Sequence, residues 1–272
     1  CISPEQAGEL LIKQIWQLIP PNLDIKRLVL TAPVESYKAY RSWLFEVCKY
    51  LPVEEIALVD EPTAAAMGAE LPAGSKLLVM DIGGSTVDFS LVALEGGEGR
   101  AAPIAQLLRF SGEDLQSNSR QVLRCAKVLV KAGLRLGGRD LDRWIANYLF
   151  PDSTPSEDLL NAAERLKCRL SDEKLSSFEL IEELQVEAAS PLRLCRNDFE
   201  ELLIKRGLFE AIDNLLKQTL ASGRANGCNL EELQGVVVVG GGTRIPLIRQ
   251  WLSKKTQPAP LLTPPPVEAV AL

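Results

Sequence analysis

Two aspartates flank a turn of small residues in the middle of the chain. Asp81 ends an apolar run, and Asp88 lies near the start of a second apolar run that continues to Leu94. The residues between them include Gly83, Gly84, Ser85 and Thr86. The pattern predicts a β-hairpin over residues 76–94 with both carboxylates near its tip. Glycines let backbone N–H groups approach an anion, and carboxylates can hold a metal ion through water. The stretch suits a phosphate–Mg²⁺ site, or is an ordinary hairpin with a glycine-rich turn.

A second glycine-rich turn lies near the C-terminal end of the sequence. The β-branched run at residues 235–239 predicts a central strand, and Gly240, Gly241 and Gly242 follow it directly. A helix is expected to begin shortly after Arg244. A strand, a glycine turn and a helix start together form a favourable cradle for an anion or a nucleotide.

Two further groups of polar residues allow two interpretations each. Glu61 follows a predicted strand and opens a predicted helix, so it either caps that helix or contributes to a ligand site at the carboxyl edge of a sheet. Glu164, Lys167 and Ser171 share one face of a predicted helix, either as a solvated ion-pair stripe or as a binding face. Acids after Gly138, such as Asp142, are expected to be exposed in the first turn of a helix.

The elements that would position these residues alternate between strands and helices. Strands are expected at 27–31, 56–59 and 104–108, and helices at 4–18, 36–50 and from residue 61. This alternation favours an α/β sheet with parallel pairing. Further along, helical stretches are expected at 113–131 and, after a capping box of Asn197 and Glu200, at 198–222, with a strand-like interval at 178–186.

Composition narrows the class of protein. The chain has 272 residues, a net charge of −6, 46% hydrophobic residues and 24% charged residues, which argues against a general nucleic-acid or anionic-membrane binder. It has six dispersed cysteines and no histidine, which excludes a Cys/His zinc site and a Ser/His pair. Reduced thiols are typical of cytosolic proteins, so a cytoplasmic protein is expected. Because the sequence begins at Cys1 rather than Met, a fragment of a longer protein is also expected.

Five segments occur in an order that resembles one family. They are DEPTAAAMGAE, DIGGSTVDFS, LGGRDLD, AERLKCRLS and VVVVGGGTRIP. In this order they resemble the later two-thirds of the ATPase domain of heat shock protein 70 (DnaK-type) chaperones, from about residue 3 to Leu272. The resemblance implies an α/β, actin-like ATPase (ribonuclease H-like) fold with two lobes, the N-terminal part of lobe I being absent.

The resemblance also implies roles for individual residues. It implies catalytic roles for Asp81, Glu61 and Asp88, of which Asp81 and Glu61 would bind Mg²⁺ through water. ATP or ADP would be bound by Gly83, Gly84, Ser85, Thr86, Glu164, Lys167, Ser171, Gly240, Gly241 and Arg244. Pro33 and Arg41 would relay the nucleotide state to a substrate domain. The reaction implied is phosphoryl transfer to water, accelerated by positioning and charge stabilisation.

The sequence also departs from the family pattern. Cys168 stands where an arginine stacks on adenine in the family, Ser85 replaces a glycine, and Asp60 replaces an asparagine. A helical insertion is expected at about 108–134. The family's first phosphate loop, its catalytic lysine and its peptide-binding domain do not lie in this sequence.

These observations predict a division of the chain and a function. Residues 1–74 would be the remaining half of lobe I, residues 75–136 and 226–272 the sheet subdomain of lobe II, and residues 137–225 a mixed α/β cap. The function implied is part of the ATPase domain of an Hsp70-like chaperone, inactive alone, with co-chaperones and unfolded clients as partners and neither nucleic acid nor membrane. A non-catalytic nucleotide-sensing or partner-docking module and a sugar-kinase-like phosphotransferase are the alternatives.

Overall fold

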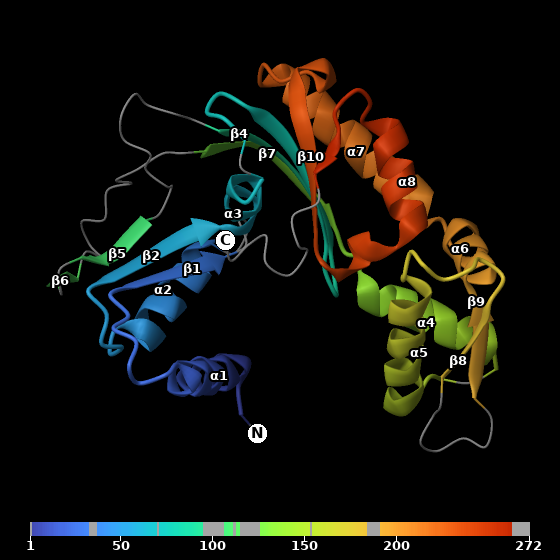
Figure 1. Cartoon of the computed structure of the whole chain (residues 1–272), viewed down its shortest axis with the longest axis horizontal. Coiled ribbons are helices and arrows are strands. Elements are labelled where there is room, and N and C mark those ends of the chain that lie inside the picture. The colour runs from blue at the N-terminus through green and yellow to red at the C-terminus, as the bar shows by residue number, and fades with distance from the viewer. Residues whose placement is uncertain are drawn as a thin grey trace.

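The described parts of the chain form, in the computed structural model, two main β-sheets and a third, two-stranded one, with helices packed on them (Figure 1). The structure describes residues 2–32, 37–69, 71–94, 106–110, 113–114, 126–152, 154–183 and 191–262. The N-terminal part contains strands β1 (Arg27–Ala32) and β2 (Glu55–Asp60) and helices α1 (Pro4–Leu18) and α2 (Tyr37–Cys48). The two strands are parallel, as the alternation of strands and helices predicts.

Helix α1 begins where the sequence signals it. The Ser3 side chain accepts a hydrogen bond from the Gln6 backbone, and the Gln6 side chain accepts one from the Ser3 backbone, which forms a capping box. Ile12 and Trp16 of α1 pack against a small core formed with α2 and β2. Leu11, Leu18 and other apolar residues of the helix remain exposed.

The larger sheet has five strands in the order β11-β10-β3-β4-β7. These strands are β3 (Lys76–Ile82), β4 (Val87–Leu94), β7 (Ala126–Leu134), β10 (Leu233–Val239) and β11 (Leu261–Leu262). Strands β3 and β4 form the predicted antiparallel hairpin, in which Asp81 lies opposite Asp88. Strand β10 runs parallel to β3, so that Val239 pairs with Asp81. The hairpin turn and the end of β10 therefore lie at the same edge of the sheet.

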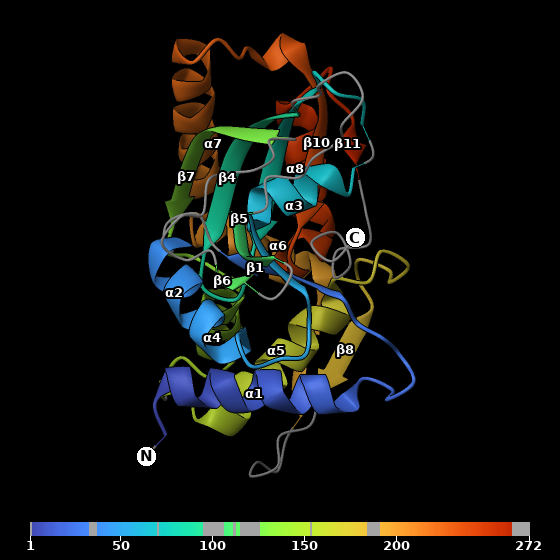
Figure 2. The ribbon, with the colours of Figure 1, turned by 90° about the vertical axis from the view of Figure 1, so that its left-hand side faces the viewer.

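Both faces of the larger sheet are covered by helices. Met80, Phe89 and Val238 belong to the main core, together with residues of α7 (Leu208–Ala225) and α8 (Pro246–Lys255). Val79 and Val237, next to them in their strands, pack against α3 (Glu61–Met67) on the opposite face. Figures 1 and 2 show α3 between the two sheets, with α7 and α8 on the far side of the larger one. The near-continuous apolar runs of β3 and β10 follow from this two-sided burial.

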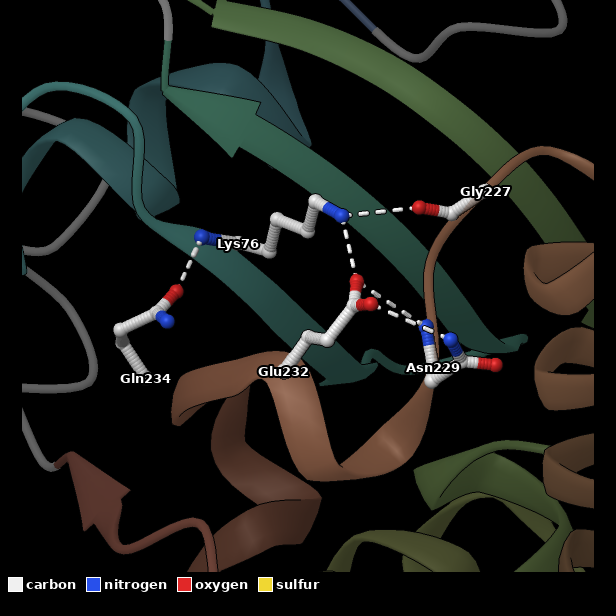
Figure 3. A network of polar contacts seen from close by, with 5 residues as sticks. All are labelled: Lys76, Gly227, Asn229, Glu232 and Gln234. Atoms are coloured by element: carbon white, nitrogen blue, oxygen red, sulfur yellow. Dashed lines mark hydrogen bonds and ion pairs between the residues drawn. The ribbon is translucent and has the colours of Figure 1, made fainter.

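The start of β3 is held by a polar network from the α7–β10 connection (Figure 3). The Lys76 Nζ donates to the Gly227 carbonyl at 2.8 Å and pairs with the Glu232 carboxylate. The Lys76 backbone N–H donates to the Gln234 side chain, and Asn229 donates to Glu232. These contacts join β3 to β10 at the end opposite the hairpin turn.

A smaller α/β unit follows β7. It contains α4 (Gly138–Leu149), α5 (Glu157–Leu170), β8 (Leu180–Glu183), β9 (Leu192–Cys195) and α6 (Arg196–Lys205). Strands β8 and β9 form an antiparallel pair. Buried Arg196 donates from Nε to the Leu170 carbonyl at 3.0 Å and from a terminal nitrogen to the Asp172 carbonyl, which ties α6 to the end of α5.

Two helix predictions are wrong. A helical stretch was expected at 113–131, within a helical insertion at 108–134, but the described residues there form strands. The main one is β7 (Ala126–Leu134), which pairs with the edge of β4. Strands β5 (Gln106–Phe110) and β6 (Glu113–Asp114) join β2 in the first sheet, although residues 75–136 were expected in the second lobe. The long helix expected at 198–222 is two helices, because Gly207 takes a left-handed φ of 77° between α6 and α7. Cys195, rather than Asn197, is the N-cap residue of α6.

Candidate functional site

Three of the predicted acids line one small pocket. Asp81 and Asp88 lie opposite each other on the sheet face that α3 covers, and Glu61 is the first residue of α3. The pocket is lined by Glu61, Pro62, Val79, Asp81, Asp88, Ser90, Lys131 and Val239, and it encloses about 20 Å³. That volume holds about one water molecule.

The two interpretations of Glu61 can be separated by the geometry of α3. Asp60 is the N-cap, because its side chain accepts a hydrogen bond from the Thr63 backbone at 2.9 Å. Glu61 is therefore not needed as the cap, although it remains in the first turn. Its carboxylate lines the acidic pocket instead.

Burial and mutual repulsion shift the titration of the pocket acids. Burial raises the pKa of Asp81, and the nearby charge of Asp88 raises it further. Burial also raises the pKa of Glu61, and the charge of Asp81 adds to the rise. The Lys131 ammonium acts in the opposite direction on both pKa values.

Lys131 was not identified from the sequence. It lies on β7, its side chain is 14% exposed, and its Nζ is 3.5 Å from the Asp88 carboxylate. Residues 126–134 contain the β-branched residues Val128 and Val130, which favour a strand. This preference is the signal that could place Lys131 on a strand.

The hairpin turn is supported from behind by the start of α4. The Gly138 N–H donates to the Gly83 carbonyl and the Arg139 N–H to the Gly84 carbonyl, both at 2.9 Å. A Cβ atom on Gly137 would lie less than 3.0 Å from backbone atoms of Gly84 and Ser85. The other side of the turn is open, since Gly84, Ser85 and Thr86 are exposed. The predicted phosphate turn is thus rigidly backed and accessible.

The second glycine turn packs against the end of β3. Gly240 has a φ of 81°, and a Cβ atom there would lie less than 3.0 Å from the Asp81 carboxylate and the Ile82 carbonyl. Only glycine permits this backbone to approach Asp81 so closely. Gly241 and Arg244, the other predicted ligands of this turn, are exposed.

Helix α5 reaches the same region through Lys167. Its Nζ is 2.7 Å from the Asp142 carboxylate and donates to the Gly138 carbonyl at 3.1 Å. Lys167 and Asp142 are both largely buried, so Lys167 is not part of a solvated stripe and Asp142 is not exposed as predicted. Burial raises the pKa of Asp142, and the Lys167 ammonium opposes the rise.

The remaining predicted residues are distributed unevenly. On α5, Glu164 and Cys168 are exposed, and the Ser171 hydroxyl donates to the Lys167 carbonyl at 2.8 Å. Arg41 lies on α2 and does not line the acidic pocket. Pro33 lies outside the described residues.

The acidic pocket suits Mg²⁺ in its chemistry but not in its size. Carboxylate oxygens such as those of Asp81 and Glu61 are the ligands that Mg²⁺ prefers, and Mg²⁺ keeps several of its waters. In the described parts of the chain no cluster of three Asp, Glu, Cys or His residues is arranged as a direct metal site. Asp81 and Glu61 would therefore hold a hydrated Mg²⁺ through its waters rather than by direct coordination.

Two family models match different parts of the chain. A family model described as Hsp70 protein matches residues 127–272, and one described as MreB/Mbl protein matches residues 2–125. The chain is 26% identical to a Chaperone protein HscA homolog of Shewanella sediminis, over 100% of this chain and 40% of that protein. It is 27% identical to Chaperone protein DnaK of Prochlorococcus marinus, over 99% of this chain and 41% of that protein.

A third relative is Chaperone protein DnaK of Thermosipho melanesiensis, which is 28% identical over 99% of this chain and 44% of that protein. The chain thus spans less than half the length of these relatives.

Across the described segments, every helix is too short or too polar to cross a membrane.

Proposed function

Because the chain belongs to the Hsp70 family and has the actin-like ATPase fold, we propose that it binds ATP or ADP as part of a chaperone ATPase domain. The observation that carries this proposal is the meeting of Glu61, Asp81 and Asp88 beside two glycine turns. Membership of this family favours the proposal over a sugar-kinase-like phosphotransferase.

Each part of the site has a distinct task in this proposal. The open turn at Gly84, Ser85 and Thr86 contacts the phosphates, because exposed backbone amides can approach an anion there. Gly241 and Arg244 contact the adenosine from the second turn. Mg²⁺ supplies charge neutralisation of the phosphates when bound.

The helical side of the site completes the nucleotide contact. Glu164, exposed on α5, faces ribose and adenine in this proposal. Lys167 and Ser171 support that face from within, since Lys167 is bonded to both Asp142 and Gly138. Exposed Cys168 lacks the planar cation of an arginine, so we expect adenine to be held weakly.

The proposal extends to hydrolysis and partners only for a longer protein. The first phosphate loop and the catalytic lysine implied by the resemblance are not in this sequence, so this chain alone should hydrolyse ATP poorly or not at all. In a complete cytoplasmic chaperone, ATP hydrolysis would be coupled to unfolded clients and co-chaperones, with Pro33 and Arg41 in the relay.

Nucleotide titration tests the proposal directly. Binding of a fluorescent ATP analogue is measured with and without Mg²⁺, and unlabelled ATP and ADP serve as competitors. We expect Mg²⁺ to strengthen binding, and Asp81→Asn to remove that gain. Asp152→Asn is the matched control, because Asp152 is an exposed acid outside the pocket. Absence of competable binding would refute the proposal.

A non-catalytic role is the second candidate, and the exposed thiol of Cys168 on α5 favours it. Phosphate release from a chain extended to the full length of its relatives separates the two. Nucleotide binding without phosphate release would support a nucleotide-sensing module, and release above background would support an ATPase.

A further inference from the structure

Lys131 lies inside the acidic pocket because of the register between β4 and β7. Lys131 pairs with Ser90, and Asp88 pairs with Gly133 two positions further along β7. Residues opposite each other in an antiparallel pair share a face, and diagonal neighbours on that face are within reach of long side chains. Lys131 and Asp88 are such diagonal neighbours, and Ser90 lines the same pocket.

The absence of a side chain at Gly133 makes this contact possible. A Cβ atom there would lie less than 3.0 Å from the Asp88 carboxylate oxygen. The carboxylate can therefore lie across β7, where its oxygen is 3.5 Å from the Lys131 Nζ. The side chains of Lys131 and Asp88 are 14% and 21% exposed, so water screens their attraction only weakly.

Lys131 offsets part of the negative charge around the pocket. Glu61, Asp81 and Asp88 bring three carboxylates to a space that holds about one water. Like charges directly opposite each other in a sheet, as Asp81 and Asp88 are, destabilise it. Among the described residues that line this pocket, Lys131 is the one cation.

We propose that the Lys131 ammonium is the cation of the acidic pocket and occupies the place beside Asp88 where a free metal ion would otherwise lie. The nucleotide-free protein then needs no metal ion there, and Mg²⁺ enters only with phosphates. The second statement rests on the proposed nucleotide site, whereas the first does not. Lys131 is thus a positioning residue that sets the ion requirement of the site.

The test measures ion binding in the absence of nucleotide. Mn²⁺ is titrated as a spectroscopic probe, and melting temperatures are compared in Mg²⁺, K⁺ and tetramethylammonium chloride at equal ionic strength. We expect the wild-type chain to show no Mn²⁺ binding that depends on Asp81, as judged by comparison with Asp81→Asn. We also expect its melting temperature to be the same in the three salts. Lys131→Met should lower the melting temperature in tetramethylammonium and regain part of it in Mg²⁺ or K⁺.

Lys131→Met should also create a Mn²⁺ site, with an affinity about tenfold or more above any Mn²⁺ binding by the wild-type chain, because one charge has an effect of this size on a neighbouring group at this range. Lys127→Met is the matched control, because Lys127 lies on the same strand, is exposed and is outside the pocket. It should behave as wild type, and so should Lys131→Arg, which keeps the cation.

Two results would overturn the inference. One is a Mn²⁺ site in the nucleotide-free wild type that Asp81→Asn removes, which is decisive even if Lys131→Met does not fold. The other is a folded Lys131→Met variant with the ion response of wild type. Failure to bind ATP would refute the proposed function instead, and it would leave both of these ion measurements unchanged.

Discussion

Gly137→Ala should destabilise the phosphate turn from behind. The new methyl carbon would lie less than 3.0 Å from the N and C atoms of Ser85 and the C atom of Gly84. All three are backbone atoms, so no side-chain rotation can relieve the overlap. Gly137 has a φ of −148°, an extended conformation that alanine adopts freely, so the overlap is the whole effect.

The size of the loss follows from what must move. Relief requires the turn and the start of α4 to separate, which strains the Gly138–Gly83 and Arg139–Gly84 hydrogen bonds. Overpacking costs about 1–3 kcal/mol, and the two hydrogen bonds contribute about 0.5–1.5 kcal/mol each. Since one displacement accounts for both terms, we expect a loss of about 2–4 kcal/mol. At about 2–4 °C per kcal/mol, the melting temperature falls by about 4–16 °C.

Scanning calorimetry of Gly137→Ala beside Gly84→Ala tests this reasoning. A Cβ atom on Gly84 meets nothing within 4 Å, so that variant should keep the melting temperature of wild type. Its methyl group lies on the open side of the turn, so it should weaken nucleotide binding without loss of stability. A Gly137→Ala variant as stable as Gly84→Ala would show that the turn is not held as described.

Three further changes have defined outcomes. Because burial raises the pKa of Asp81, folding favours the protonated form of its carboxyl group. The stability that this group contributes is therefore present at low pH and is lost as pH rises through the raised pKa. In calorimetry, Asp81→Asn should therefore raise the melting temperature more at about pH 8 than at about pH 4, and the reverse order would contradict this. Lys167→Met leaves buried Asp142 without its cation and should lower the free energy of unfolding in urea by about 3–5 kcal/mol. The double variant Lys167→Met with Asp142→Leu should lose less, because no unpaired charge remains buried. Equal losses in the two variants would refute this pairing argument. Cys168→Arg should tighten adenine nucleotide binding about fivefold in the fluorescence titration, since a cation over an aromatic ring contributes about 1 kcal/mol. Cys168→Ser should leave that affinity unchanged, and the absence of any gain with arginine would place adenine elsewhere.

Elements whose structure depends on residues close in sequence could be predicted from the sequence. The apolar runs of β3 and β4 around a glycine turn predict the hairpin, and the structure has it with Asp81 opposite Asp88. The capping box at Ser3 predicts the start of α1. The actin-like ATPase fold and the Hsp70 family followed from the order of five motifs, and both are confirmed.

The errors arose where partners distant in sequence decide the outcome. Residues 126–134 can form a helix or a strand, and the free edge of β4 selects the strand. The place of Lys131 in the pocket depends on its register with Ser90, which no local pattern specifies. Asp142 is buried because Lys167, from another helix, reaches it. Gly207 is a local signal for the break between α6 and α7, because glycine readily takes a left-handed φ.

The pairing of β5 with β2 has a consequence for biosynthesis. Ile56, Ala57 and Leu58 of β2 form their outer ladder with residues 106–109. Those residues leave the ribosome later than β2, by a delay on the order of seconds at about 5–20 residues per second. During that delay a strand of apolar residues has an open edge, which is a template for aggregation. A nascent chain of this chaperone relative therefore exposes, for a time, the kind of unpaired segment that makes folding chains dependent on chaperones.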